Sequence, residues 1–263
     1  MNKRFIFLFI ISLVPMTNSY AMQRTKLTNN LFKYNFSQCL GTCAAKAQEH
    51  LEKALTQYSP ENIALVLDID DTCIMTKESF NKLTEGDYSR SKYDSSNPPA
   101  ILQIRNLSLW ASNLGIKIYY LSARPDKMPL SNPNQEFVDR LPDHRSMLNN
   151  AGYSNITDFS TTLICQKYEE YREDPEQIGR WKQEELARIK KSCSEIVFLD
   201  DQETNIDPKA EGQYLVPTPL NQFTPKQSIR AMMDLWPDDE INENDKIVEE
   251  YNPYIFPAED SES

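Results

Sequence analysis

Three carboxylates, Asp68, Asp70 and Asp71, stand within four residues, directly after a short apolar run over residues 63–67. Such a run is typical of a strand that is buried on both faces. Burial does not explain the carboxylates, because neighbouring negative charges repel one another and resist removal from water. A divalent cation would stabilise them, since hard cations take oxygen ligands. The segment therefore predicts a Mg²⁺ site at the end of a strand.

Other polar groups stand at similar places later in the chain. Ser122 follows a predicted strand over residues 116–121, Asp200 and Asp201 follow another, and Lys182 lies near the start of a charged helix. The carboxyl ends of parallel strands lie at one edge of a sheet, so we expect these groups to converge there. Phosphoryl transfer needs such a set: a nucleophile, an acid for the leaving group, a cation and donors for the phosphate oxygens.

Each of the later groups also has an ordinary structural interpretation. Ser122 could cap the end of its strand. Lys182 could be a solvated helix charge, with Lys167 as the rival for its role. Asp201 could begin a turn, since Asp is common there. Arg124, close after Ser122, could bind phosphate or stabilise its own loop. These alternatives stay open at the level of the sequence.

The elements expected around these groups alternate between strands and helices. This alternation indicates a Rossmann-like, three-layer α/β/α fold with a mostly parallel sheet. The sequence predicts strands over residues 63–67, 116–121, 159–165, 195–199 and 214–216, and helices over residues 38–55, 100–114, 136–151 and 176–191. No glycine-rich phosphate loop is present, which argues against ordinary nucleotide-binding folds.

The order and spacing of the polar groups resemble the four motifs of the haloacid dehalogenase (HAD) superfamily. Asp-Ile-Asp-Asp-Thr at residues 68–72 resembles the first motif, and Leu-Ser-Ala-Arg at residues 121–124 the second. Arg-Trp-Lys, ending at Lys182, resembles the third, and the acidic segment 200–205 the fourth. Within the superfamily, the N-terminal signal, the helix before the first motif and the Asp-Gln pair resemble the class B and plant-type acid phosphatases (subfamily IIIB).

This resemblance implies a phosphatase and a role for each motif residue. Asp68 would attack phosphorus and become an aspartyl-phosphate, which is covalent catalysis by a carboxylate. Asp70 would protonate the leaving oxygen and then take a proton from the attacking water. Ser122 and Lys182 would bind the phosphate oxygens and neutralise charge in the transition state. Asp71 has no implied chemical role and is expected to serve the turn.

The resemblance also implies Mg²⁺ as the cofactor. The cation would bridge Asp68 and the phosphate, with the backbone carbonyl of Asp70 and the side chain of Asp201 as further ligands and Asp200 as the second choice. Class B relatives carry Gly-Asp-x-x-x-Asp in the fourth motif. Here Asp200 stands at the glycine position and Asn205 at the last position. The sequence departs from that group while it keeps the carboxylates needed for catalysis.

Residues 74–98 are polar and irregular, and we expect a small cap insertion between the first and second motifs. Phe80, Tyr88 and Tyr93 could stack on an aromatic leaving group such as a nucleoside, or they could pack the cap itself. A cap this small indicates an open site that accepts many phosphomonoesters. The alternatives are a 5′-nucleotidase of the same chemistry and a non-catalytic secreted binding or storage protein. The two first-motif carboxylates argue against the last.

The N-terminal residues 1–21 read as a secretory signal peptide. They combine a basic start, an apolar run and small residues at the expected cleavage site. The apolar run is shorter than the roughly 20 residues of a membrane-spanning helix. We therefore expect an exported protein, periplasmic or secreted, with no stable membrane insertion after cleavage. Residues 22–236 would form the phosphatase domain.

The charge and the cysteines limit the partners. The formal net charge is −11, and residues 237–263 contribute ten acidic side chains and one lysine. The acidity is therefore local, and no basic patch indicates a nucleic-acid polymer as partner. This tail also holds aromatic residues, so it could be disordered, return to the domain or bind a protein.

The chain has only two histidines, which excludes a His-rich zinc site. It has five cysteines, and this odd number leaves at least one thiol unpaired within a monomer. They are Cys39, Cys43, Cys73, Cys165 and Cys193.

Overall fold

The computed structural model describes residues 36–84, 93–129, 137–153, 161–170 and 173–220, together with the backbone of Tyr254 and Ile255. The expected signal peptide and most of the acidic tail lie outside these residues. Among the helices of the described part, none combines the length and the apolar character needed to cross a bilayer. All five cysteines fall within the described ranges and all are free thiols.

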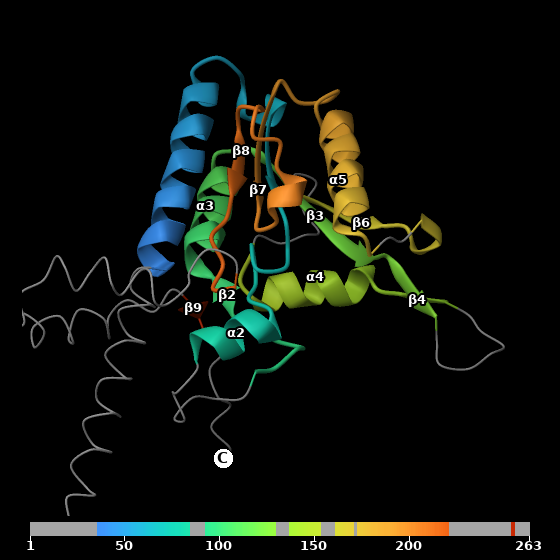
Figure 1. Ribbon diagram of the computed structural model, residues 1–263. Coiled ribbons are helices and arrows are strands. Elements are labelled where there is room, and N and C mark those ends of the chain that lie inside the picture. Colours follow the sequence, from blue (N-terminus) through green and yellow to red (C-terminus); the bar gives the residue numbers. More distant parts are fainter. Residues whose placement is uncertain are drawn as a thin grey trace, which may run out of the picture.

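A five-stranded parallel sheet forms the middle layer, in the order β6-β3-β1-β7-β8 (Figure 1). Its strands are β1 (Ile63–Leu67), β3 (Lys117–Pro125), β6 (Thr161–Gln166), β7 (Glu195–Asp200) and β8 (Gln213–Leu215). The chain builds outward from β1 in one direction through β3 and β6, and then in the other through β7 and β8. Open α/β sheets bind ligands outside the carboxyl ends of the strands at such a switch point.

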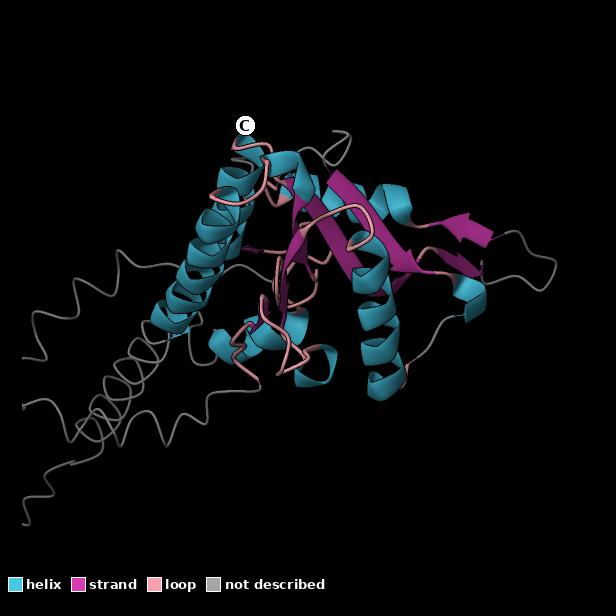
Figure 2. Cartoon of the chain, turned by 90° about the horizontal axis from the view of Figure 1, so that it is seen from above, coloured by secondary structure: helices cyan, strands magenta, loops and turns pink. Residues whose placement is uncertain are grey.

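Helices cover both faces of this sheet, which confirms the predicted three-layer architecture (Figures 1 and 2). One face packs against the helix over residues 36–55, α3 (Leu102–Asn113) and α4 (Leu141–Asn150), and the other against α5 (Pro175–Ile189). Alternate side chains of β1 enter the two cores: Ile63, Leu65 and Leu67 on the first face, Ala64 and Val66 on the second. Each fully buried side chain of Leu or Ile contributes about 1.5–3 kcal/mol.

Several predicted boundaries need correction. β3 continues to Pro125 and so contains Ser122, which we expected to follow the strand. The helix expected over 136–151 begins only at Leu141, because Phe137–Asp139 forms strand β5 and pairs antiparallel with β4 (Lys127–Pro129). Pro142 is favourable in the first turn of α4 because its missing N–H has no partner to lose there. The helix expected over 100–114 begins at Leu102, after the short strand β2 (Ala100–Ile101).

The segment expected to be an irregular insertion is partly helical and packed. Helix α2 (Lys77–Leu83) begins after Thr76, whose hydroxyl accepts a hydrogen bond from the backbone N–H of Ser79 at 3.3 Å. Such an N-cap satisfies one of the free N–H groups of the first turn. Several apolar side chains of this segment are buried in the same core as the sheet: Ile74, Met75, Phe80 and Leu83.

Two of the aromatic residues considered for substrate stacking serve this packing. The ring centroids of Phe80 and Tyr93 lie 5.5 Å apart, and Phe80 is 4% exposed. The hydroxyl of Tyr93 donates to the carbonyl of Met75 at 3.1 Å. These two rings therefore pack the protein, which was one of the two alternatives. Tyr88 lies outside the described residues.

The acidic tail returns to the domain at two residues. Strand β9 (Tyr254–Ile255) pairs antiparallel with β2, with Ala100 opposite Ile255. Ala100 also bridges Ile74, and Ile74 in turn bridges Asp70. The tail is thus connected, through β2, to the segment that follows the first motif. The short 3-10 helices complete the described elements: η1 (Pro60–Asn62), η2 (Tyr168–Glu170) and η3 (Glu203–Asn205).

Candidate active site

The loop after β1 carries the first-motif carboxylates. The backbone N–H of Asp68 still donates to the carbonyl of Leu199 in β7, at 2.9 Å, so Asp68 is held at the strand tip. Asp71 has a φ of 54°, a left-handed conformation that Asp tolerates better than most residues. Its carboxylate accepts hydrogen bonds from the backbone N–H and the hydroxyl of Thr76, both at 2.8 Å. Asp71 therefore closes the turn, as expected.

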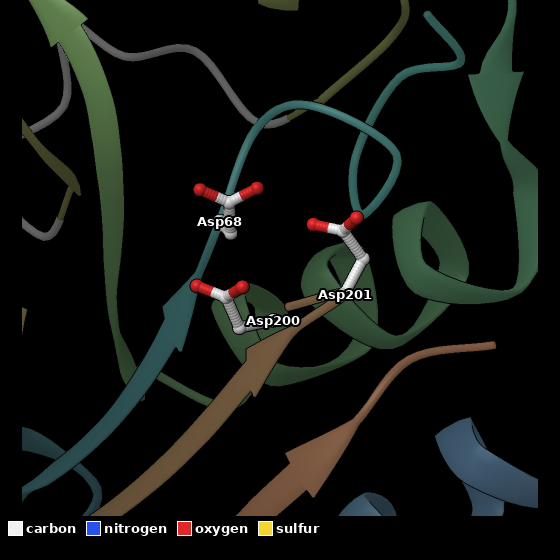
Figure 3. A group of neighbouring side chains, drawn as sticks. All are labelled: Asp68, Asp200 and Asp201. Atoms are coloured by element: carbon white, nitrogen blue, oxygen red, sulfur yellow. The ribbon is translucent and has the colours of Figure 1, made fainter. Parts of the chain in front are cut away.

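Three buried carboxylates gather at the carboxyl ends of β1 and β7. One oxygen from each of Asp68, Asp200 and Asp201 lies within 4.8 Å of the others. These residues are 5%, 0% and 5% exposed. Figure 3 shows the carboxylate of Asp68 just beyond the end of β1, with Asp200 at the last residue of β7 and Asp201 directly after it. β7 thus includes Asp200, which we expected to follow the strand. The predicted convergence of the first and fourth motifs is confirmed.

Lys182 reaches this cluster from α5 on the opposite side of the sheet from α3. Its Nζ donates to Oδ1 of Asp68 at 2.5 Å and to Oδ2 of Asp200 at 2.6 Å. Burial acts to lower the pKa of Lys182, but the charges of the two carboxylates outweigh it and raise that pKa above its ordinary value. Lys182 therefore stays cationic, whereas its rival Lys167 is exposed.

Close packing of α5 brings Lys182 to this position. Gly179 lies one turn before Lys182, and a Cβ at Gly179 would stand only 2.3 Å from the carbonyl oxygen of Thr204 in η3. Only a residue without a side chain allows the helix backbone to approach this carbonyl. Gly179 was not among the residues predicted from the sequence. The available signal was a single glycine inside an otherwise charged, amphipathic helix.

The two aspartates of the fourth motif have different surroundings. Oδ1 of Asp200 accepts from the side-chain amide of Asn205 at 2.8 Å and from the backbone N–H of Gln202 at 2.9 Å, while Oδ2 accepts from Lys182. Asp201 accepts a hydrogen bond from the side chain of Gln202 at 2.5 Å. Three donors already occupy Asp200, so Asp201 keeps more lone-pair capacity for a cation.

The electrostatics of the cluster fit a hard cation. Three carboxylates face one lysine, so negative charge is in excess. Burial, opposed by Lys182 and reinforced by Asp200, raises the pKa of Asp68 to about 8. Burial, reinforced by Asp68 and Asp200, raises the pKa of Asp201 to about 9. A divalent cation would supply the missing positive charge and favour the ionised carboxylates, and an all-oxygen donor set suits Mg²⁺.

Asp70 is not one of the three clustered carboxylates, and its side chain pairs with Arg124. Its Oδ1 accepts from Nη2 of Arg124 at 2.6 Å and its Oδ2 accepts from Nε of Arg124 at 2.8 Å. The metal-ligand role expected for Asp70 concerns its backbone carbonyl and stays a prediction. Ser122 is 1% exposed, and its Oγ accepts from the backbone N–H of Arg124 at 3.2 Å. Ser122 thus has the local structural role that we considered, and its phosphate-binding role also stays a prediction.

Comparisons with known proteins place few constraints on this site. No family model matches the sequence, and no curated protein is significantly similar to it. Two solved structures of the class C acid phosphatase from Bacillus anthracis resemble the fold, and one of them has tungstate bound. Both have a TM-score of 0.49, with 17% and 16% identity, and the alignments cover 81% of this chain and 99% and 97% of theirs.

Both structures are acid phosphatases, the kind of enzyme that the four motifs resemble, although they belong to class C rather than to the class B and plant-type group. At this TM-score and identity the likeness carries no argument about activity. The functional assignment rests on the geometry of the site.

Proposed function

We propose that the protein is a Mg²⁺-dependent phosphomonoesterase that forms an aspartyl-phosphate on Asp68. The observation that supports this most strongly is the set of buried charges around Asp68. A carboxylate at the switch point of the sheet contacts a buried lysine at 2.5 Å and lies beside two further carboxylates. A structural role alone would leave this negative charge uncompensated inside the protein.

The two carboxylate oxygens of Asp68 can have different roles in the reaction. Oδ1 is held by Lys182, which leaves Oδ2 to attack phosphorus. In the first step Oδ2 forms a bond to phosphorus. The ester P–O bond breaks, its electron pair stays on the leaving oxygen, and that oxygen takes the proton of Asp70, which enters this step in its protonated form. Lys182 offsets the negative charge that builds on the transferring group.

The second step returns both carboxyl groups to their starting states. Asp70, now ionised, takes one proton from a water molecule as the water oxygen bonds to phosphorus. The bond between phosphorus and Oδ2 of Asp68 breaks, and its electron pair restores the Asp68 carboxylate. The second proton of the water stays on the released phosphate. Asp68 and Asp201 are the residues that would hold Mg²⁺, and the cation would supply positive charge to offset that of the carboxylates and the phosphate oxygens.

The proposal includes export and a broad substrate range. Export is inferred from residues 1–21, whose pattern is that of a cleaved signal peptide. Phe80 and Tyr93 pack within the protein, so neither ring supports a narrow nucleotidase preference. The buried contact of Lys182 with Asp68 argues against the non-catalytic alternative. A protein partner for the acidic tail stays a proposal without structural support.

Phosphate release from a panel of phosphomonoesters, with Mg²⁺ or with EDTA, tests this function. Wild type should release phosphate with Mg²⁺ and lose the activity in EDTA. Asp68→Asn should be inactive, because the amide is a poor nucleophile, whereas Asp143→Asn on the exposed surface should behave as wild type. Equal release by wild type and Asp68→Asn would refute the mechanism. A folded wild type that releases no phosphate from any ester would support the binding or storage alternative.

A further inference from the structure

We propose that Arg124 is a positioning residue that holds the carboxyl group of Asp70 in place for proton exchange with the leaving oxygen and then with water. The inference rests on the phosphatase function proposed above and extends it to a residue outside the expected catalytic set. It differs from the two interpretations that the sequence left open, in which Arg124 binds phosphate or stabilises its loop.

The contact between the two side chains is bidentate. Nη2 of Arg124 donates to Oδ1 of Asp70 at 2.6 Å, and Nε donates to Oδ2 at 2.8 Å. A planar guanidinium that uses two N–H groups on both oxygens of one carboxylate fixes the plane and the direction of that carboxyl group. A lysine ammonium would supply the charge without the fork. The side chain of Asp70 is 39% exposed, so burial alone does not restrain it.

Two further contacts hold Arg124 in place. Its backbone N–H donates to the buried Oγ of Ser122 at 3.2 Å, and its Nη1 lies 3.3 Å from Sδ of Met147 in α4. The pairing of β3 with β6 is irregular between Ser122 and Pro125. Such irregularities change the direction of a side chain at the end of a strand. Here this places the guanidinium of Arg124, from β3, against Asp70 in the loop after β1.

The position of a proton donor decides how well it works. A misplacement of about 1 Å can reduce a rate by about 10²-fold. If Arg124 orients Asp70, its loss should slow the cleavage of esters whose leaving oxygen needs a proton, such as alkyl phosphates. Nitrophenolate leaves readily without one, so p-nitrophenyl phosphate should be affected far less. If Arg124 instead binds the phosphate group, which is the same in both substrates, its loss should lower the activity toward the two substrates equally.

The experiment compares kcat/KM for glycerol phosphate and p-nitrophenyl phosphate, because kcat/KM covers the steps up to ester cleavage. Arg124→Ala should lower the value for glycerol phosphate by about 10²-fold, the lower range of general-acid effects, and the value for p-nitrophenyl phosphate by less than about tenfold. Arg124→Lys should recover only part of the loss, since it lacks the fork. Asp70→Asn should show the same dependence on the leaving group. Arg140→Ala is the control: it removes an arginine that does not pair with Asp70, so it should not show this dependence on the leaving group.

A double variant tests whether the two residues act together. In an Asp70→Asn background, Arg124→Ala should cause no further loss that depends on the leaving group. Equal losses for both substrates, or additive losses in the double variant, would overturn the positioning role. If Arg124→Ala does not fold, Arg124→Lys supports the same comparison. A wild type inactive on both substrates would refute the phosphatase function itself, whereas an active wild type with equal losses would overturn only the role of Arg124.

Discussion

Nζ of Lys182 lies 2.6 Å from Oδ2 of Asp200, and both side chains are almost completely removed from solvent. This contact joins α5 to the end of β7 and leaves the same ammonium group free to donate to Asp68. In the resemblance to class B acid phosphatases, Asp200 falls at the position of a glycine. In this protein its carboxylate holds the lysine, and Asn205 and the backbone of Gln202 hold the carboxylate.

Replacement of Lys182 should strongly destabilise the protein. In Lys182→Met the carboxylates of Asp68 and Asp200 lose their buried cation, and the loss of one partner of such a pair costs about 3–5 kcal/mol. We expect a decrease of this size in the free energy of unfolding, measured by urea unfolding in EDTA. Lys190→Met, at the exposed end of the same helix, should change it by less than about 0.5 kcal/mol. Similar effects of the two substitutions would contradict the central role of Lys182.

The two fourth-motif aspartates should respond differently to substitution. Asp201→Ala removes the carboxylate with the most lone-pair capacity, so the Mg²⁺ concentration for half-maximal activity should rise by about 10–100-fold or more. Asp200→Ala frees Lys182, so it should mainly lower kcat with a smaller change in the Mg²⁺ requirement. Activity titrations with Mg²⁺ at saturating substrate measure both quantities. A larger shift in the Mg²⁺ requirement for Asp200→Ala would reverse the assignment of the two residues.

The metal-free protein should lose stability as pH rises. Burial raises the pKa of Asp201 to about 9 in the folded state, above the ordinary value of 3.8 for an aspartate in water. Between these values the folded state binds more protons than the unfolded state, so the free energy of unfolding falls with increasing pH. The slope for one such group is at most about 1.4 kcal/mol per pH unit.

Urea unfolding in EDTA between pH 5.5 and 8.5 measures this dependence. Asp201→Asn should reduce the slope, because the amide does not titrate, although Asp68 still contributes to it. Mg²⁺ should also reduce the slope, because it stabilises the ionised carboxylates. Asp143→Asn, with its exposed side chain, is the control and should leave the slope unchanged. A stability that rises with pH in EDTA would show that these carboxylates are ionised without a cation.

Gly179→Ala should destabilise the protein, although Gly→Ala inside a helix usually stabilises it. Its Cβ would meet the carbonyl of Thr204 at 2.3 Å, so α5 must move away from η3 and carry Lys182 with it. We expect a loss of about 1–3 kcal/mol, as for overpacking in a core, together with reduced activity. Gly41 is the matched control, because an added Cβ there has no neighbour within 4 Å. Gly41→Ala should stabilise the protein by up to about 1 kcal/mol. Thermal unfolding of both variants makes the comparison, and equal effects would contradict the close contact.

The sheet and the carboxylate cluster could be predicted because both follow from local patterns. The apolar run over 63–67 matches β1 because a strand buried on both faces needs apolar residues at every position. The meeting of Asp68 with Asp200 and Asp201 follows from parallel strands that share one edge. Lys182 was only one of two candidates, because the charge pattern of a helix does not say which lysine is buried.

Other parts of the site depend on contacts between distant segments, which no local pattern specifies. The pair of Asp70 with Arg124 joins residues 54 positions apart and needs the irregular end of β3. The close approach at Gly179 depends on the position of η3. The late start of α4 depends on the pairing of β4 with β5, which competes with the helical pattern before Leu141. Helix α2 was missed because its few apolar residues stand within a polar segment.

The cover of one sheet face by α5 has a consequence for the lifetime of the assembled site. The apolar contacts of α5 come mainly from Trp181, Leu186 and Ile189, in a smaller cluster than the one on the other face. Every local opening of this helix would carry Lys182 away from Asp68. The protection of α5 amides against hydrogen exchange therefore reports how long the charged centre stays intact between openings. Selection for a durable site would then act on the apolar side chains beneath α5 as much as on Lys182 itself.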